Sequence, residues 1–305
     1  MIKRLTVALD LTSLDEKVLT YTQFLCKSLP IEKIYFIHVA QKLDLPESYL
    51  REHPELQPLD ETLQEQMQAV VSQCLSLPEK INFEYDVLEG ELLNTLVHHS
   101  KVKLADLMVV GKRDDESHPD LLAEKLARRS PCSVLFVPET FDLNIRHILV
   151  PTDFSPHSRQ ALETAVQLSS VVDGDVIHVL NLFDVPAGYA KTGMSYEAFS
   201  ADMQRYAEED MQKFIQNLSL AGNTIETHVA DAEGNEKSHL MRDWLKNLDC
   251  QLLVAGSKGR TNITAMFLGS LTEKLIKLDL KVPVLVIKKK NESLGFFQAL
   301  VDGEI

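Results

Sequence analysis

The residues best suited to chemistry in this chain lie between Gly256 and Ser270, directly after the apolar run Gln251–Ala255. Three glycines stand there at fixed spacing, because two residues separate Gly256 from Gly259 and nine separate Gly259 from Gly269. Glycine lets a backbone turn sharply and approach a ligand closely. The helical pattern that opens at Gly269 leaves its first amides unpaired, and such amides bind anions. The spacing predicts a phosphate cradle, with a plain surface loop as the alternative.

The same stretch supplies further candidate ligands for a phosphate. The hydroxyls of Ser270 and Thr272 stand at the start of the expected helix. Lys258 and Arg260 lie inside the glycine loop, where they either contact phosphates or face solvent as ordinary loop charges. The candidate binding residues of this stretch are Gly256, Ser257, Lys258, Gly259, Arg260, Gly269, Ser270, Leu271 and Thr272.

The elements that position this stretch occur twice, since the sequence repeats itself over the length of a domain. Ile2–Asp10 and Ile145–Asp153 are short β-rich runs that end in aspartate, offset by 143 residues. Later pairs keep the same order, namely Ile37–Val39 with Ile177–Val179, Glu89–Gly90 with Glu233–Gly234, and the apolar runs that end at Gly111 and Gly256. A repeat of this size predicts two copies of one fold.

Within each copy, apolar strand-like runs alternate with amphipathic helical patterns. This alternation is typical of βαβ units in a parallel sheet that is covered on both faces. The first strand of each copy feeds a helix, with a capping box at Ser13–Glu16 and an N-cap and N1 proline at Ser155–Pro156. We therefore predict an α/β fold of two tandem doubly wound domains, with boundaries at 1–140 and 141–290 and a tail over 291–305.

The junction between the copies, Pro138–Asn144, is too short for a flexible tether. We therefore expect the two copies to pack together as an intramolecular pseudo-dimer. The tail carries apolar residues such as Phe296 and Phe297, which favours packing on a domain surface over binding a partner.

Composition excludes several classes of function. The chain has 305 residues and a formal net charge of -14, which disfavours nucleic acid and anionic membrane surfaces as partners. No segment approaches the roughly 20 apolar residues of a membrane span, so we expect a cytoplasmic protein. The four cysteines form no Cys-x-x-Cys pair, which indicates reduced packing residues in place of a disulfide or zinc framework.

A ligand of a doubly wound sheet binds beyond the carboxyl ends of the strands, where the strand order reverses. In the second copy, Asp153 ends the first strand and Gly256 ends the fourth. If these strands are neighbours, Asp153 accepts hydrogen bonds from a ribose or an adenine amine while the glycine loop holds phosphates. The alternative is that Asp153 caps the helix that begins near Ser155.

The first copy differs at this place. Glu124 lies 13 positions after Gly111, whereas the matching Glu273 lies 17 positions after Gly256. The shorter segment contains no glycine after Gly111 and carries the acidic residues Asp114, Asp115, Glu116 and Asp120, which would repel phosphates. We predict one nucleotide site per chain, in the second copy.

These motifs resemble those of the universal stress protein family, and the resemblance covers essentially the whole chain. The pattern Gly-x2-Gly-x9-Gly-Ser matches the nucleotide-binding subclass, as does Pro151–Ser155 with Pro151, Thr152 and Asp153. Val179 falls where the family uses backbone groups for adenine. In the first copy only Asp10 matches, which is similar to the degenerate domain of tandem members.

The resemblance implies an adenine nucleotide alpha hydrolase-like fold, with a five-stranded parallel sheet and about four helices in each domain. It also implies pairing through the last strands, 134–137 and 284–287. The implied ligand is ATP, with Mg²⁺ or Mn²⁺ held mainly by the phosphates.

The residues do not assemble a phosphoryl-transfer centre. The chain has no Gly-x4-Gly-Lys-Ser/Thr loop, and no catalytic residue is assigned. A metal site made only of protein ligands is not expected. His38 and His178 lie within strand patterns, His98 and His99 are adjacent, and three other histidines show no ligand spacing, namely His118, His228 and His239.

The favoured function is an ATP-binding regulatory protein of the stress-response type that changes its contacts with an unidentified protein partner when nucleotide binds. One alternative is a slow ATP hydrolase or phosphotransferase that uses the same pocket, so any enzymatic activity is at most that of a weak ATPase. The other is a nucleotide-free interaction scaffold. A further homodimer is left open.

Overall fold

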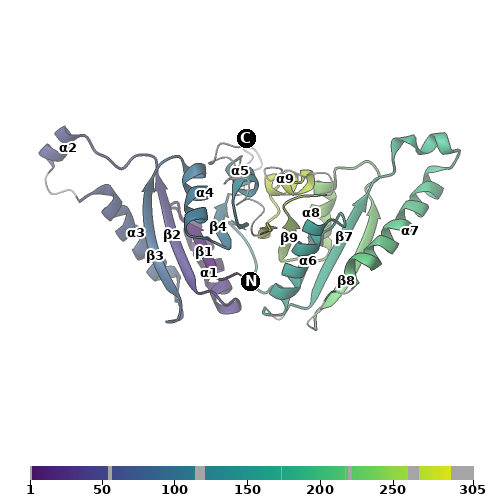
Figure 1. The fold of residues 1–305 in the computed structure, drawn as a ribbon, viewed down its shortest axis with the longest axis horizontal. Coiled ribbons are helices and arrows are strands. Elements are labelled where there is room, and N and C mark those ends of the chain that lie inside the picture. Colours follow the sequence, from purple (N-terminus) through teal and green to yellow (C-terminus); the bar gives the residue numbers. More distant parts are fainter. Residues whose placement is uncertain are drawn as a thin grey trace. The chain divides into compact units, whose positions relative to one another are not determined.

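The computed structural model of the protein describes residues 2–53, 57–113, 121–172, 174–216, 218, 222–259 and 268–289 (Figure 1). Arg260, the acidic residues between positions 114 and 120, His118 and the tail 291–305 lie outside the described residues. The chain divides into two compact units, one formed by residues up to Thr140 and the other beginning at Phe141.

The first unit alternates strands and helices along the chain. Its elements are β1 (Arg4–Ala8), α1 (Leu14–Ser28), β2 (Lys33–Ala40), α2 (Glu47–Glu52), α3 (Leu59–Cys74), β3 (Asn82–Glu89), α4 (Leu92–Val102), β4 (Leu107–Lys112), α5 (Leu121–Arg129) and β5 (Ser133–Pro138). The strands are parallel and lie in the order β3-β2-β1-β4-β5.

The second unit repeats this plan. Its elements are β6 (His147–Pro151), α6 (Pro156–Ser169), β7 (Val176–Phe183), the 3-10 helix η1 (Ala187–Thr192), α7 (Tyr196–Ile215), β8 (Thr224–Asp231), α8 (Lys237–Asn247), β9 (Leu252–Gly256), α9 (Ser270–Lys277) and β10 (Val284–Ile287). The parallel order β10-β9-β6-β7-β8 reverses direction between β6 and β9. The predicted α/β class with parallel sheets is therefore confirmed. The pairing of the two copies through their last strands stays a prediction.

The apolar runs of the sequence form the central strands. All five residues of β9 and all six of β5 are buried. In the second unit α6 packs on β6, β9 and β10, and the long α7 packs along β7 and β8 (Figure 1). A parallel strand that is buried on both faces needs apolar residues at consecutive positions, which explains runs such as Gln251–Ala255.

The repeat extends to unusual backbone conformations. Leu11 and Phe154, which directly follow the matched aspartates, have φ angles of 60° and 64°. Leu104 and Asp249, at matched positions before β4 and β9, have φ angles of 53° and 48°. Non-glycine residues seldom adopt this left-handed region because the Cβ atom is crowded there. The two copies therefore share the left-handed residue after their first strand. The helix caps differ, because Ser155 caps α6 with its side chain, whereas the predicted capping box at Ser13–Glu16 is wrong and Ser13 makes no such bond.

Within the part of the chain that the structure describes, every helix is too short or too polar to cross a lipid bilayer.

Candidate functional site

The carboxyl ends of β6, β7 and β9 border a cavity of about 330 Å³ in the second unit. This volume lies in the range of small-molecule sites, about 300–1,000 Å³. Ten of the residues that the sequence singles out line this cavity, namely Pro151, Thr152, Asp153, Gly256, Lys258, Gly259, Gly269, Ser270, Leu271 and Thr272. The fold thus brings the aspartate motif and the glycine motif, about a hundred residues apart in sequence, to one place.

Three of the predicted residues are not placed in the cavity lining. Val179 is fully buried in β7 between Val150 of β6 and Thr227 of β8, and the cavity is lined by the next three residues, Leu180 to Leu182. Ser257 is buried beside β10, where its amide donates to the Ile287 carbonyl at 3.0 Å. Arg260 lies outside the described residues.

Gly256 and Gly259 serve close packing and not a sharp turn, which corrects one part of the sequence interpretation. None of Gly256, Gly259 and Gly269 has a positive φ angle. A Cβ on Gly256 would lie 2.8 Å from the His157 carbonyl carbon, so this glycine lets α6 approach β9. A Cβ on Gly259 would lie 2.8 Å from Oδ2 of Asp153. Gly259 therefore lies directly beside that carboxylate.

The N-terminus of α9 opens at the cavity. Gly269 is the N-cap, and no side chain caps it. Ser270, Leu271 and Thr272 form the first turn and line the cavity, so amides that have no partner within the helix are located there. The Thr272 hydroxyl donates to the Gly256 carbonyl at 2.8 Å. This hydrogen bond links α9 to the end of β9. Ser270 carries the exposed hydroxyl of the first turn of α9.

The N-cap of α6 is Ser155, so the alternative in which Asp153 caps this helix is wrong, and a ligand contact of Asp153 stays a prediction. Oδ1 of Asp153 accepts a hydrogen bond from the Ser155 amide at 3.1 Å, and Ser155 in turn caps α6 by accepting from the Ser158 amide at 3.2 Å. Asp153 also lines the cavity. The carboxylate therefore fixes the β6–α6 turn while it faces the space where a ligand would lie.

Several residues of the cavity were not predicted from the sequence. Asn181 is buried, and its side-chain amide donates to the Thr152 carbonyl at 2.7 Å. Lys237, at the start of α8, lines the cavity and forms an ion pair with Asp184 at 2.7 Å. Lys237 and Lys258 give the cavity positive charge in a chain whose formal net charge is -14. The sequence signal for Lys237 was its position three residues after Gly234, which belongs to one of the repeated pairs.

A comparison with protein families decides the identity of the fold. The model of the universal stress protein family matches residues 1–138 and 144–288. The chain belongs to the universal stress protein family. Its two matched segments correspond to two tandem family domains, as the repeat predicts.

Individual relatives agree with this assignment. The chain is 28% identical over 158 residues to universal stress protein MJ0577 of Methanocaldococcus jannaschii, covering 48% of this chain and 96% of that protein. It is similar to a crystal structure of a universal stress protein from Archaeoglobus fulgidus, with a TM-score of 0.59, 17% identity and coverage of 93% and 98%. It is also similar to PA1789 of Pseudomonas aeruginosa, whose function is described as unknown, with a TM-score of 0.62, 15% identity and coverage of 99% and 98%.

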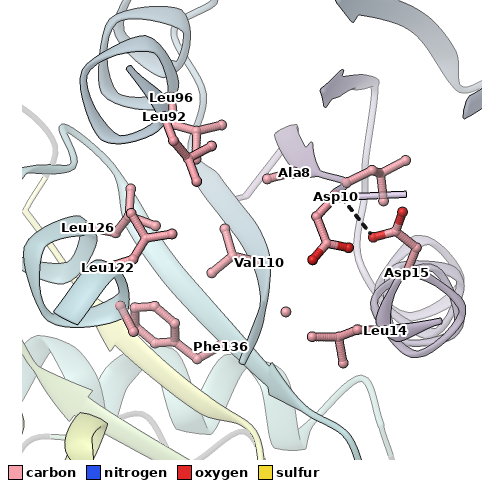
Figure 2. Close-up of a pocket in the computed structure, with 13 residues that line it drawn as sticks. Ala8, Asp10, Leu14, Asp15, Leu92, Leu96, Val110, Leu122, Leu126 and Phe136 are labelled. Atoms are coloured by element: carbon pink, nitrogen blue, oxygen red, sulfur yellow. Dashed lines mark hydrogen bonds between the residues drawn. The ribbon is translucent and has the colours of Figure 1, made fainter. Parts of the chain in front are cut away.

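The first universal stress protein domain has a different cavity at the matching strand ends. Its volume is about 120 Å³, and leucines from α4 and α5 face Asp10 and Asp15 across it (Figure 2). The charged side chains among its described lining residues are both acidic. Such a lining does not suit a phosphate. A single nucleotide site per chain stays a prediction.

The two carboxylates of this smaller cavity have opposite pKa shifts. Asp15 is 2% exposed, and burial raises its pKa to about 6 although it accepts hydrogen bonds from the amides of Asp10 and Leu11, at 3.1 and 2.8 Å. Burial also opposes ionisation of Asp10, but hydrogen bonds from Thr12 and the nearby Arg113 hold the pKa of Asp10 below its usual range.

Proposed function

We propose that this universal stress protein binds ATP in the cavity of its second domain and acts as a stress-response regulator. The observation that supports the proposal is the joint lining of one cavity by Asp153, the glycine loop and the first turn of α9. Each of these groups suits a different part of a nucleotide, because amides at a helix N-terminus favour phosphate and a carboxylate favours hydroxyl or amine donors.

In the proposed complex the phosphates lie against the first turn of α9, with Lys258 and Lys237 supplying positive charge. Asp153 accepts hydrogen bonds from the ribose or the adenine amine. A divalent ion, Mg²⁺ or Mn²⁺, accompanies the nucleotide and is held mainly by its phosphates. Among the described lining residues Asp153 is the single carboxylate, so the protein itself offers little metal coordination there.

The same lining favours binding over turnover. Its described residues include no histidine, cysteine or arginine, and its one carboxylate already accepts the Ser155 amide. An efficient phosphoryl-transfer centre needs a group that orients the nucleophile and a cation that stabilises the transition state. A slow ATP hydrolase or phosphotransferase remains the second candidate, and a nucleotide-free scaffold the third.

Regulation in this proposal depends on ATP stabilising one conformation of the second-domain loops more than the others. ATP that binds one conformation of the second-domain loops increases the population of that conformation and so changes contacts with a protein partner. The proposal places the protein in the cytoplasm, with domains at 1–140 and 141–290, an intramolecular pseudo-dimer and the option of a further homodimer.

The decisive experiment is mass spectrometry of the ligand released from freshly purified protein, followed by calorimetric titration with ATP. Intact ATP supports the regulator, whereas ADP with measurable phosphate release supports the slow hydrolase. If no nucleotide is released and millimolar ATP gives no binding heat, the scaffold is the better description.

A substitution tests the location of the site. Gly259→Asp places a side chain and a negative charge against Asp153 and the phosphates, so ATP affinity should fall by at least about 100-fold, which corresponds to about 2.7 kcal/mol. Gly188→Asp is the matched control, because a Cβ at Gly188 meets nothing within 4 Å and the residue does not line the cavity. A folded Gly259→Asp variant that binds ATP as tightly as this control would show that the site is elsewhere.

A further inference from the structure

Four side chains that bind metals well in other proteins meet on one face of the second domain's sheet. His147 begins β6, His178 is the third residue of β7, and Glu226 and His228 lie on β8. The parallel register pairs His178 with Glu226 and also with Leu149, two residues after His147. Because side chains alternate between faces along a strand, all four point to the same side. None of them lines the ATP cavity.

The distances within this cluster match those of a metal site. His178 Nδ1 lies 3.1 Å from His228 Nε2 and 3.4 Å from Glu226 Oε2. The three ligand atoms all lie within 4.8 Å of one another. Zinc binds nitrogen and oxygen at about 2.0–2.2 Å, so neighbouring ligands of a tetrahedral ion are about 3.3 Å apart. Little rearrangement is therefore needed to place one ion among the three atoms.

The second ring nitrogen of His178 also has a partner. Coordination through His178 Nδ1 leaves the proton on Nε2, and His147 Nδ1 lies 2.9 Å from that atom as its acceptor. Metal-binding histidines usually have such a partner on the second ring nitrogen, which fixes the ring orientation.

The first domain shows how the same sheet positions are arranged around a lysine instead. The strand register places Tyr35 where the second domain has His178, although the sequence repeat matched His38 with that residue. It places Glu84 and Asp86 where the second domain has Glu226 and His228. There Lys103 Nζ lies 3.0 Å from Glu84 and 3.1 Å from Asp86. An ammonium group thus bridges the two carboxylates. In the second domain the residue that matches Lys103 is the apolar Leu248, and histidines replace Tyr35 and Asp86.

We propose that His178, Glu226 and His228 bind one divalent transition-metal ion, with Zn²⁺ as the best fit, and that His147 positions His178 for this. Two imidazoles and a carboxylate are the ligand types that zinc accepts, and three protein ligands leave a fourth position for water. The Glu226 side chain is 53% exposed, which gives the ion a route from solvent to the buried His178. The ion would join two neighbouring strands, so the second domain should become more stable as zinc is added.

The test uses the full chain, stripped of metal with a chelator and kept free of nucleotide. Equilibrium dialysis against Zn²⁺ with elemental analysis should give one ion per chain. Titration with Co²⁺ should quench the fluorescence of Trp244, the single tryptophan of the chain, whose ring lies 5.0 Å from that of His228.

Two kinds of variant separate a metal site from a hydrogen-bonded histidine cluster. Glu226→Gln keeps the size of an exposed side chain and should weaken zinc binding by at least about tenfold, and His147→Phe should weaken it by about 10–100-fold through loss of the positioning contact. The matched controls are Glu208→Gln and His239→Gln, which change exposed residues of the same domain and should leave the affinity unchanged.

The proposal is overturned if the wild-type chain retains no zinc after dialysis. It is also overturned if Glu226→Gln and His228→Gln bind zinc with wild-type affinity. Both results are independent of whether the protein binds ATP, because the cluster and the cavity share no residue.

Discussion

Gly256 and Gly111 occupy matched positions at the ends of β9 and β4, yet a methyl group would meet different atoms at each. On Gly256 the added Cβ would lie 2.8 Å from the His157 carbonyl carbon, 2.9 Å from its oxygen and 3.1 Å from the Ser158 amide nitrogen. These are backbone atoms of the first turn of α6. On Gly111 the nearest atom is Cδ2 of Leu14, at 2.5 Å, which is the end of a flexible side chain.

The different neighbours of the two glycines determine how much each alanine substitution should lower the unfolding free energy. Ordinary contact begins at 3.4 Å, so Gly256→Ala forces α6 away from β9, where the two elements pack closely. Overpacking of this kind costs about 1–3 kcal/mol. Replacing glycine also reduces the conformational entropy of the unfolded chain, which stabilises the folded protein by roughly 0.4–1 kcal/mol. We expect a net loss of about 1–2 kcal/mol for Gly256→Ala. Leu14 borders the cavity of Figure 2 and has room to move, so Gly111→Ala should cost less than about 1 kcal/mol.

The assay is urea denaturation of the full chain. Trp244 lies on α8, so its fluorescence reports the unfolding of the second domain, and far-ultraviolet circular dichroism follows both domains. Gly256→Ala should lower the midpoint seen by Trp244, while Gly111→Ala leaves that midpoint in place and shifts the dichroism only slightly. If Gly256→Ala leaves the Trp244 midpoint unchanged, the close approach of α6 to β9 does not depend on the missing side chain and the reasoning fails.

Two further predictions concern the stability of each domain. The folded-state pKa of Asp15 is raised to about 6, above its unfolded value of about 3.9, so the wild type takes up a proton on folding and gains stability as the pH falls. Urea titrations at pH 7 and pH 5 should show the wild type gaining about 1 kcal/mol relative to Asp15→Asn, and an unchanged difference would refute the shift. Gln251 is buried, and its Oε1 accepts the amides of Arg146 and His147 at 3.0 and 2.9 Å. Gln251→Ala should lower the unfolding free energy of the second domain, followed by Trp244, by about 1–3 kcal/mol, and a loss within the error of the assay would contradict the role of that bridge.

Much of the fold was predictable because the same order of strand and helix patterns occurs in both halves of the sequence. The run Leu252–Ala255 is apolar at successive positions, and Ser155–Pro156 marks a helix start, so strand and helix could each be assigned from local rules. The order of such elements along the chain then favoured one parallel topology. The grouping of Asp153 with Gly259 followed from the rule that strand ends meet at one edge of a sheet.

The features that the sequence did not predict depend on which atoms approach one another in space. The role of Gly256 depends on the position of the His157 backbone, which no local pattern encodes. The histidine cluster depends on strand register, because His147, His178 and His228 are separated by 31 and 50 residues and show no ligand spacing in sequence. Register is a property of the assembled sheet, so this cluster was visible only once the strands were paired.

The shared left-handed turn after the first strand of each domain affects how nucleotide-binding domains should be recognised in other tandem members of the family. Leu11 and Phe154 both hold a conformation that costs on the order of 1 kcal/mol or more, although only the second copy carries the glycine loop. The presence of that turn therefore reflects the need to start a helix directly after a strand. An aspartate beside the turn is weak evidence that a domain binds a nucleotide. Homologues are better sorted by the segment between their fourth strand and last helix, where the two copies of this chain differ in length and in glycine content.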